Sequence, residues 1–176
     1  MIFVICCRYD LILTRIMGIL NTDDMENQLD DYVERVWPTV EDLRTFLRLP
    51  HCKILVVDRL NEIDVEHEIR TTIPAQTVKV LDIAGASDAD HDSLVDTFVR
   101  YGAHTLFLLK NIDRASGESI RTLINCAMKS DCSYPASGQD ELDFSPLRIV
   151  ATGCAYPGYL REGTGSFIVE VKGPDD

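Results

Sequence analysis

The feature that most constrains this chain is a regular alternation of short apolar runs with longer amphipathic segments between residues 53 and 152. Short aliphatic runs bounded by turn residues or charges are typical of buried strands, and the segments between them repeat apolar residues at helical spacing. Such alternation predicts βαβ units, and therefore a mostly parallel sheet with helices on both faces. The four runs are KILVV at 53–57, VKVLDI at 78–83, TLFLL at 105–109 and LRIVAT at 147–152.

Further segments extend this pattern at both ends. A strand is expected at 167–171, which brings the sheet to about five strands. Helical spacing predicts one helix at 25–36 and a second that ends before Pro50. We therefore divide the chain into an N-terminal strand and helical segment at 1–50 and an α/β core at 51–176.

The first twenty residues are apolar, but Arg8, Asp10 and Arg15 interrupt them. A membrane span needs about 20 largely uncharged residues, and a secretory signal needs a cleaner apolar stretch with a small-residue cleavage site. We expect neither here, and predict a buried strand at 2–6 followed by a helix.

The chain is strongly acidic, with 29 Asp and Glu against 17 Lys and Arg, and a net charge of −12. Such a field repels nucleic-acid phosphates and anionic lipid, and no stretch clusters Lys and Arg. We therefore expect neither direct nucleic-acid binding nor membrane binding. Solubility, a docking surface for a basic partner, and imitation of DNA all explain the acidity. A protein partner is the expected one, and an oligomer is compatible with the sequence.

The six cysteines do not have metal-site spacing. Cys6 and Cys7 are adjacent, and Cys126 and Cys132 have neither a second pair nor a histidine nearby. Structural zinc sites usually take their ligands in close pairs from tight turns. We therefore predict free thiols in a reducing compartment, which means a cytoplasmic protein without a bound metal.

A second possible metal site surrounds His91, which stands between Asp90 and Asp92. Together with Asp88 these side chains could hold a metal weakly. They also lie at the start of a predicted helix, where aspartates cap free N–H groups and complement the helix dipole. Capping is therefore the expected role.

Polar side chains follow the predicted strands. Asp58 ends the first, Lys110 and Asn111 follow the third, and Cys154 comes soon after the fourth. In parallel sheets, ligands bind beyond the carboxyl ends of the strands. A binding site, if the chain has one, is therefore expected among these residues.

Three stretches resemble the AAA+ family of ATPases, over roughly residues 53–172. They are VKVLDIAGASDADHDSLVDTFVRYG, AHTLFLLKNIDRASGESIRTLINCA and LRIVATGC. The second is similar to the family's Walker B strand with its acidic pair and following helix. The third is similar to the strand that ends in the first polar sensor, where this chain has Thr152. The resemblance implies a P-loop NTPase-like, three-layer α/β sandwich.

The chain departs from the family at both catalytic elements. The positions of the acidic pair hold Lys110, whose ammonium group cannot bind Mg²⁺, and Asn111, whose amide cannot act as a base. No glycine occurs between Val57 and Lys79, so the phosphate loop is absent. The acidic side chains there would repel a triphosphate, at about 4 kcal/mol for each like-charge contact at ~4 Å.

These departures imply that the domain has no catalytic residue and no nucleotide cofactor. The remaining candidates for contacting a cofactor are Lys110, Asn111, Asp113 and Thr152, although Asp113 is also typical of a helix cap. The expected function is a pseudo-ATPase: a non-catalytic, ATPase-like domain that regulates or caps a protein partner.

Other functions stay open. The charge fits an acidic inhibitor that occupies a basic, nucleic-acid-binding surface of another protein. Cys154 could serve a thiol-dependent enzyme with His104 as its base. The KILVVD run also resembles the first strand of a response-regulator receiver, but a receiver needs an aspartate where this chain has Lys110. The glycines at 163 and 165 are typical of a hairpin turn.

Overall fold

The computed structural model describes residues 36–37, 40–49, 53–61, 63–102, 104–129, 133–134, 141–160 and 167–171. All of them belong to one compact unit, Arg35–Asp176. The strand predicted at 2–6 and the helix predicted at 25–36 lie outside the described residues, except that Val36 is the first residue of a strand.

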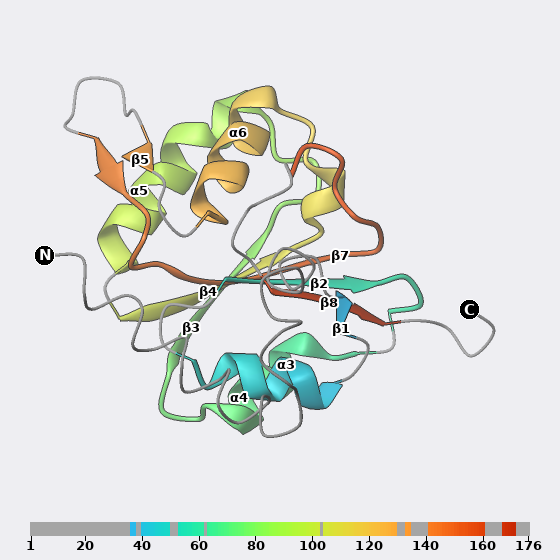
Figure 1. Cartoon of the computed structure of the whole chain (residues 1–176). Coiled ribbons are helices and arrows are strands. Elements are labelled where there is room, and N and C mark those ends of the chain that lie inside the picture. The colour runs from blue at the N-terminus through green and yellow to red at the C-terminus, as the bar shows by residue number, and fades with distance from the viewer. Residues whose placement is uncertain are drawn as a thin grey trace, which may run out of the picture. The chain divides into compact units, whose positions relative to one another are not determined.

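A parallel sheet forms the middle layer (Figure 1). Its order is β1-β8-β2-β7-β4-β3, and each neighbouring pair is parallel. The strands are β1 (Val36–Trp37), β2 (Lys53–Asp58), β3 (Thr77–Asp82), β4 (Thr105–Lys110), β7 (Arg148–Gly153) and β8 (Phe167–Val171).

The order of the five longer strands defines the fold class. Counted along the chain, they lie in the order 5-1-4-3-2, so the first strand sits between the fourth and the fifth. The chain is therefore an α/β, P-loop-like sandwich, as the sequence predicted. A receiver has the flavodoxin-like order 2-1-3-4-5, so the receiver hypothesis is wrong.

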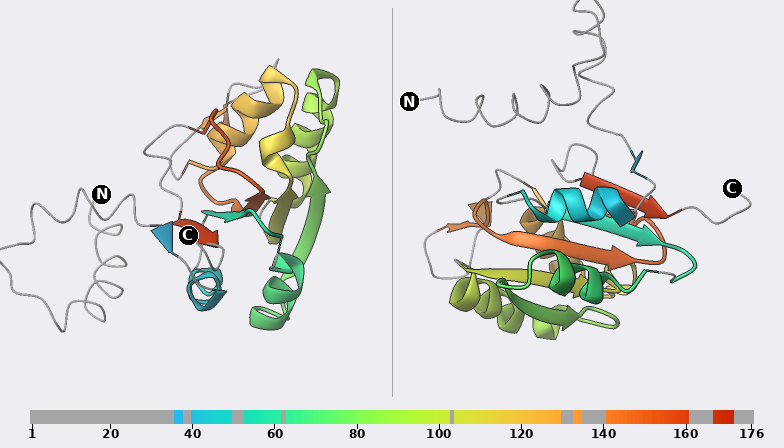
Figure 2. Two further views of the ribbon diagram at one scale, coloured as in Figure 1. Left: turned by 90° about the vertical axis from the view of Figure 1, so that its right-hand side faces the viewer. Right: turned by 90° about the horizontal axis from the view of Figure 1, so that it is seen from below.

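Helices cover both faces of the sheet (Figure 2). One face carries α3 (Val40–Leu47) and α4 (Val65–Thr72), and the other carries α5 (His91–Tyr101) and α6 (Glu118–Ala127). Two short 3-10 helices, η3 (Asp88–Asp90) and η4 (Ile112–Arg114), stand at the carboxyl edge.

Side chains of the central strands alternate between two cores. In β2, Ile54 and Val56 pack with α3 and α4, whereas Leu55 and Val57 pack with α5 and α6. This period of two follows from the pleat, and it explains why both cores are apolar although the run KILVV has no alternation in type.

The predicted strands and helices of the core are confirmed to within about two residues, and α3 extends the unit beyond its predicted limit. We placed a boundary at residue 50, but the compact unit begins at Arg35. The reason is that Leu43, Phe46 and Leu47, at helical spacing, are buried in the same core as the inner strands.

Two features were missed between α6 and β8. The stretch predicted as a polar loop holds an antiparallel ladder of β5 (Ser133–Tyr134) and β6 (Leu142–Asp143). The glycines at 163 and 165 lie outside the described residues, but β7 and β8 are separated by β2, so no hairpin joins them. Among the described residues, no helix is long and apolar enough to cross a membrane.

Candidate functional site at the carboxyl edge of the sheet

A cavity of about 450 Å³ opens where β2, β4 and β7 end. The connection from β2 to α4 forms one side of it, and the residues that follow β4 and β7 form the other. The lining residues are Asp58, Asn61, Ile63, Asp64, Val65, Glu66, Lys110, Asn111, Thr152, Gly153 and Cys154. The sequence predicted a site at this edge, and three of its four candidate residues lie here.

The β2–α4 connection is held by its own carboxylates. Asp58, the last residue of β2, accepts a hydrogen bond from the backbone N–H of Ile63 on Oδ2 at 2.7 Å. Asp64 caps α4 and accepts the N–H of His67 on Oδ1 at 3.0 Å. Asn61 turns the chain between them with a left-handed φ of 55°, a conformation that asparagine tolerates better than most residues.

This arrangement has a direct consequence for anions. A phosphate loop binds phosphate because its backbone N–H groups and the start of the following helix point at the ligand. Here Asp58 and Asp64 already accept such N–H groups with negatively charged oxygens. The connection therefore presents carboxylates where a phosphate loop presents donors.

Lys110 and Asn111 are engaged by acidic neighbours. Lys110 Nζ donates to Glu66 Oε2 at 3.1 Å, and Glu66 also pairs with Arg70 at 2.9 Å. Hydrogen bonds from Arg70, and then from Lys110, hold the pKa of Glu66 below its usual range. Asn111, with a φ of 58°, donates to Asp82 Oδ1 at 2.9 Å and is the main cause of the lowered pKa of Asp82.

Asp113 differs from the other three candidate residues, because it does not line the cavity. It lies in η4, so close behind Gly153 that a Cβ on this glycine would stand 2.8 Å from Asp113 Oδ1. It does not cap α6 as its position suggested. That helix is capped from a distance, because the Ser119 N–H donates to Asp88 Oδ1 at 2.8 Å.

Cys154 lines the cavity as a half-buried free thiol, but the structure does not bring His104 to it. His104 precedes β4, whereas Cys154 follows β7, and the two strands are parallel neighbours. The two residues are therefore at opposite edges of the sheet, about 20 Å apart along a six-residue strand. The pairing of Cys154 with His104 was wrong.

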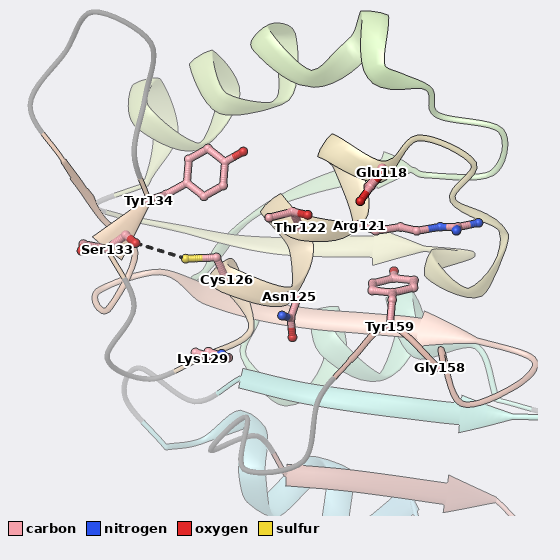
Figure 3. A pocket seen from close by; sticks show the side chains of 10 residues that line it. All are labelled: Glu118, Arg121, Thr122, Asn125, Cys126, Lys129, Ser133, Tyr134, Gly158 and Tyr159. Carbon is pink, nitrogen blue, oxygen red and sulfur yellow. Dashed lines mark hydrogen bonds between the residues drawn. The ribbon is translucent and has the colours of Figure 1, made fainter.

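A second cavity, of about 770 Å³, lies along α6 (Figure 3). Arg121 lies over the ring of Tyr159, 5.9 Å from its centroid, and the Tyr159 hydroxyl donates to Ile112 O at 2.8 Å. Burial raises the pKa of Tyr159, so this phenol stays neutral. The groove has mixed polarity: its charged side chains are Glu118, Arg121 and Lys129.

Cys126 in this second cavity corrects the prediction that the thiols are all free. It is disulfide-bonded, although its partner lies outside the described residues. A disulfide sulfur has no proton to donate, so its 3.5 Å approach to Ser133 O, dashed in Figure 3, is a packing contact. The predicted cytoplasmic location depended partly on free thiols, and it stays a prediction.

The aspartates around His91 act mainly as caps. Asp90 accepts from both the N–H and the hydroxyl of Ser87 at 2.9 Å, and the backbone contact is the main cause of its lowered pKa. His91 bridges Asp92 and the Tyr134 hydroxyl at 2.8 and 2.7 Å. Within the described part of the chain, no three His, Cys, Asp or Glu side chains are grouped to hold a metal.

Sequence reasoning missed two parts of the site. The pairing of Lys110 with Glu66 joins residues 44 positions apart, and no local pattern indicates it. The enclosure of Asp58, which is only 7% exposed, was also missed. The available signal was its place at the end of β2, directly after four consecutive apolar residues.

Comparison with known proteins adds little to this geometry. No family model and no curated protein matches the chain. A point mutant of RuvB from Thermotoga maritima is a similar solved structure, with a TM-score of 0.45 and 14% identity. The match covers 76% of this chain and 42% of the RuvB chain, which is less than half of that protein's length. The class of this protein, a P-loop-like α/β domain, therefore follows from its own strand order.

Proposed function

We propose that this chain is a non-catalytic, P-loop-like domain that acts through protein–protein contact and regulates or caps a partner. One observation supports this most strongly. Two N–H groups at the β2–α4 connection, those of Ile63 and His67, are bound by the carboxylates of Asp58 and Asp64.

The second catalytic element supports the same proposal. Lys110 stands where the likeness to AAA+ ATPases would place a metal-binding carboxylate, and it is paired with Glu66. Mg²⁺ is bound through carboxylates and phosphate oxygens, so an ammonium group at this position excludes it by like charge. Nucleotide binding and hydrolysis are therefore disfavoured by two separate features.

A nucleotide titration with the full chain tests the proposal. Mg·ATP and Mg·GTP are titrated from micromolar to millimolar concentration by calorimetry, and phosphate release is followed over hours. We expect no saturable binding and no turnover. Micromolar affinity for either nucleotide, or turnover that scales with protein concentration, would contradict the proposal.

A matched variant separates the two features. Lys110→Asp combined with Asn111→Glu restores an acidic pair but leaves the β2–α4 connection unchanged. We expect this double variant to remain inactive, because Asp58 and Asp64 still bind the N–H groups of Ile63 and His67 and still repel a phosphate. Turnover in the double variant would show that the connection does not exclude nucleotide.

The acidic charge favours a second candidate, an inhibitor of a nucleic-acid-binding protein. A partner captured by the full chain separates the two. Double-stranded DNA displaces the partner if the chain occupies its basic surface, and high salt weakens such a complex steeply. A complex that resists both treatments excludes the inhibitor and fits a regulatory partner.

A further inference from the structure

The cavity at the carboxyl edge has an excess of negative charge in its lining. Asp58, Asp64 and Glu66 are acidic, and Lys110 is the one basic side chain among the residues that line it. Lys110 is already paired with Glu66. Asp58 and Asp64 lie on the β2–α4 side, and among the described residues each accepts a backbone N–H but neither pairs with a basic side chain.

Asp58 carries a further signal. Asp58 lines the cavity and is 7% exposed, and while its Oδ2 accepts the Ile63 N–H, its Oδ1 is buried and has no hydrogen-bond partner among the described residues. Enclosing a carboxylate oxygen without a donor is unfavourable, more so than for a neutral group. The terminal torsion of an aspartate is broad, so a small rotation can turn this oxygen towards a donor in the cavity.

The donor set favours an organic cation over a metal ion. A divalent ion takes most of its ligands from carboxylates, carbonyls and water, and the described residues offer no group of three metal-binding side chains. A guanidinium or ammonium group needs fewer charged partners than a divalent ion: one buried carboxylate and a few neutral hydrogen-bond acceptors are enough. Asn61 and Thr152 add neutral oxygen atoms to the lining.

We propose that this cavity binds the guanidinium or ammonium group of a basic side chain that a protein partner inserts, with Asp58 as its main counter-ion. The inference rests on the proposed function, since it assigns the partner's chemistry to the same site. The partner is recognised by one arginine or lysine that enters the cavity, and the acidic surface steers its approach.

The test uses NMR titration of the full chain with three probes: acetyl-arginine amide, acetyl-lysine amide and, as an uncharged control, acetyl-norleucine amide. We expect the arginine or lysine probe to shift the backbone amides of Asn61, Ile63 and Gly153 saturably, and the norleucine probe to leave them unchanged. Asp58→Asn keeps the size of the side chain and removes its charge, so affinity should fall at least tenfold.

Two further variants make the test specific. Asp96→Asn removes the same charge from an exposed position on α5, away from the cavity, and should change affinity less than twofold. Lys110→Met removes the competing cation and should strengthen binding. An equal loss in Asp58→Asn and Asp96→Asn, or no gain in Lys110→Met, would overturn the inference in favour of a general charge effect.

Two more arms identify the ligand. MgCl₂ alone should not reproduce the shifts; saturable binding of Mg²⁺ that Asp58→Asn abolishes would make this a metal site and overturn the inference. A short peptide with one central arginine should bind more tightly than acetyl-arginine amide, and equal affinity would indicate a small free ligand and overturn the assignment to a protein. Nucleotide binding is measured in a separate experiment. A failure of the proposed non-catalytic function can therefore be distinguished from a failure of the cation-binding inference.

Discussion

Two acidic connections leave the same edge of the sheet, and they use their carboxylates differently. In the β3–α5 connection, Asp82 accepts hydrogen bonds from Asn111 and from the Ala84 N–H, while Asp88 caps α6. The oxygen atoms of these carboxylates thus accept donors from neighbouring segments and hold those segments together. In the β2–α4 connection, Asp58 is more deeply buried, yet its Oδ1 has no hydrogen-bond partner in the part of the chain that the structure describes.

This difference gives a criterion that separates carboxylates with a structural role from carboxylates that are candidates for binding a ligand. Both connections contain aspartates at helix starts, so composition does not separate them. A carboxylate whose oxygens are met by N–H groups contributes to stability, because those donors lower its pKa and are themselves satisfied. A carboxylate enclosed without enough donors is a cost to the fold, and a cationic ligand can remove that cost.

The largest expected change in stability comes from a substitution that disrupts the β3–α5 connection. A Cβ on Gly117 would stand 2.5 Å from Asp88 N and 2.6 Å from Asp88 Oδ1, so Gly117→Ala must displace backbone. We expect the free energy of unfolding to fall by about 2–3 kcal/mol, as overpacking does elsewhere, measured by urea denaturation. Gly158→Ala is the matched control, because nothing lies near its Cβ. A loss below ~0.5 kcal/mol in Gly117→Ala would show that the connection yields easily.

A smaller change in stability is expected at the residues with left-handed backbone conformation in the two connections. These are Gly85, with a φ of 74°, and Asn61, with a φ of 55°. Gly85→Ala should destabilise by about 1–2 kcal/mol, since Cβ is strained in this region. Asn61→Gly should change stability little, because glycine adopts the same φ freely. Thermal unfolding monitored by circular dichroism measures both. Equal losses in the two variants would mean that Asn61 is needed for its side chain and not for its backbone.

The smallest expected effect concerns Glu66, whose pKa is held down by Arg70 and Lys110. Lys110→Met should raise the pKa of Glu66 towards its ordinary value while leaving Arg70 in place. Because the pKa of the folded state is lowered, Glu66 adds stability above its unfolded-state pKa, and this is lost as the pH falls through the lower folded value. An NMR pH titration of Glu66 in both proteins measures the shift, with Asp96→Asn as the control. No change in the pKa would mean that Lys110 does not act on Glu66 in solution.

Much of the fold was predictable from the sequence, because the pattern that indicates each strand lies within a few contiguous residues. The runs that became β2, β4 and β7 each hold three or four consecutive apolar residues without alternation, which is typical of strands that are buried on both faces. The place of Lys110, Asn111 and Thr152 at the cavity followed as well, because the ends of parallel strands meet at one edge. The same rule would have separated His104 from Cys154, since one precedes its strand and the other follows it.

Other features could not be predicted because they depend on pairs far apart in the chain. The two-residue strands β1, β5 and β6 carry too little pattern to be recognised, and only their partners define them. The role of Asp113 was misjudged for a related reason. Its neighbour is Gly153, which lies close to it because β7 pairs with β4 in the sheet.

The sequence by itself determined the α/β class, and it also determined that the β2–α4 connection has no glycine to form a phosphate-binding loop. Both are properties of contiguous residues, set by hydrophobic pattern and by the φ angles that side chains allow. Only the tertiary structure decided which acids are satisfied. The sequence does not show whether the carboxylate oxygens of Asp58 and Asp88 find donors, because this depends on the distant segments that pack against them, and that difference makes the cavity beside Asp58 the candidate site.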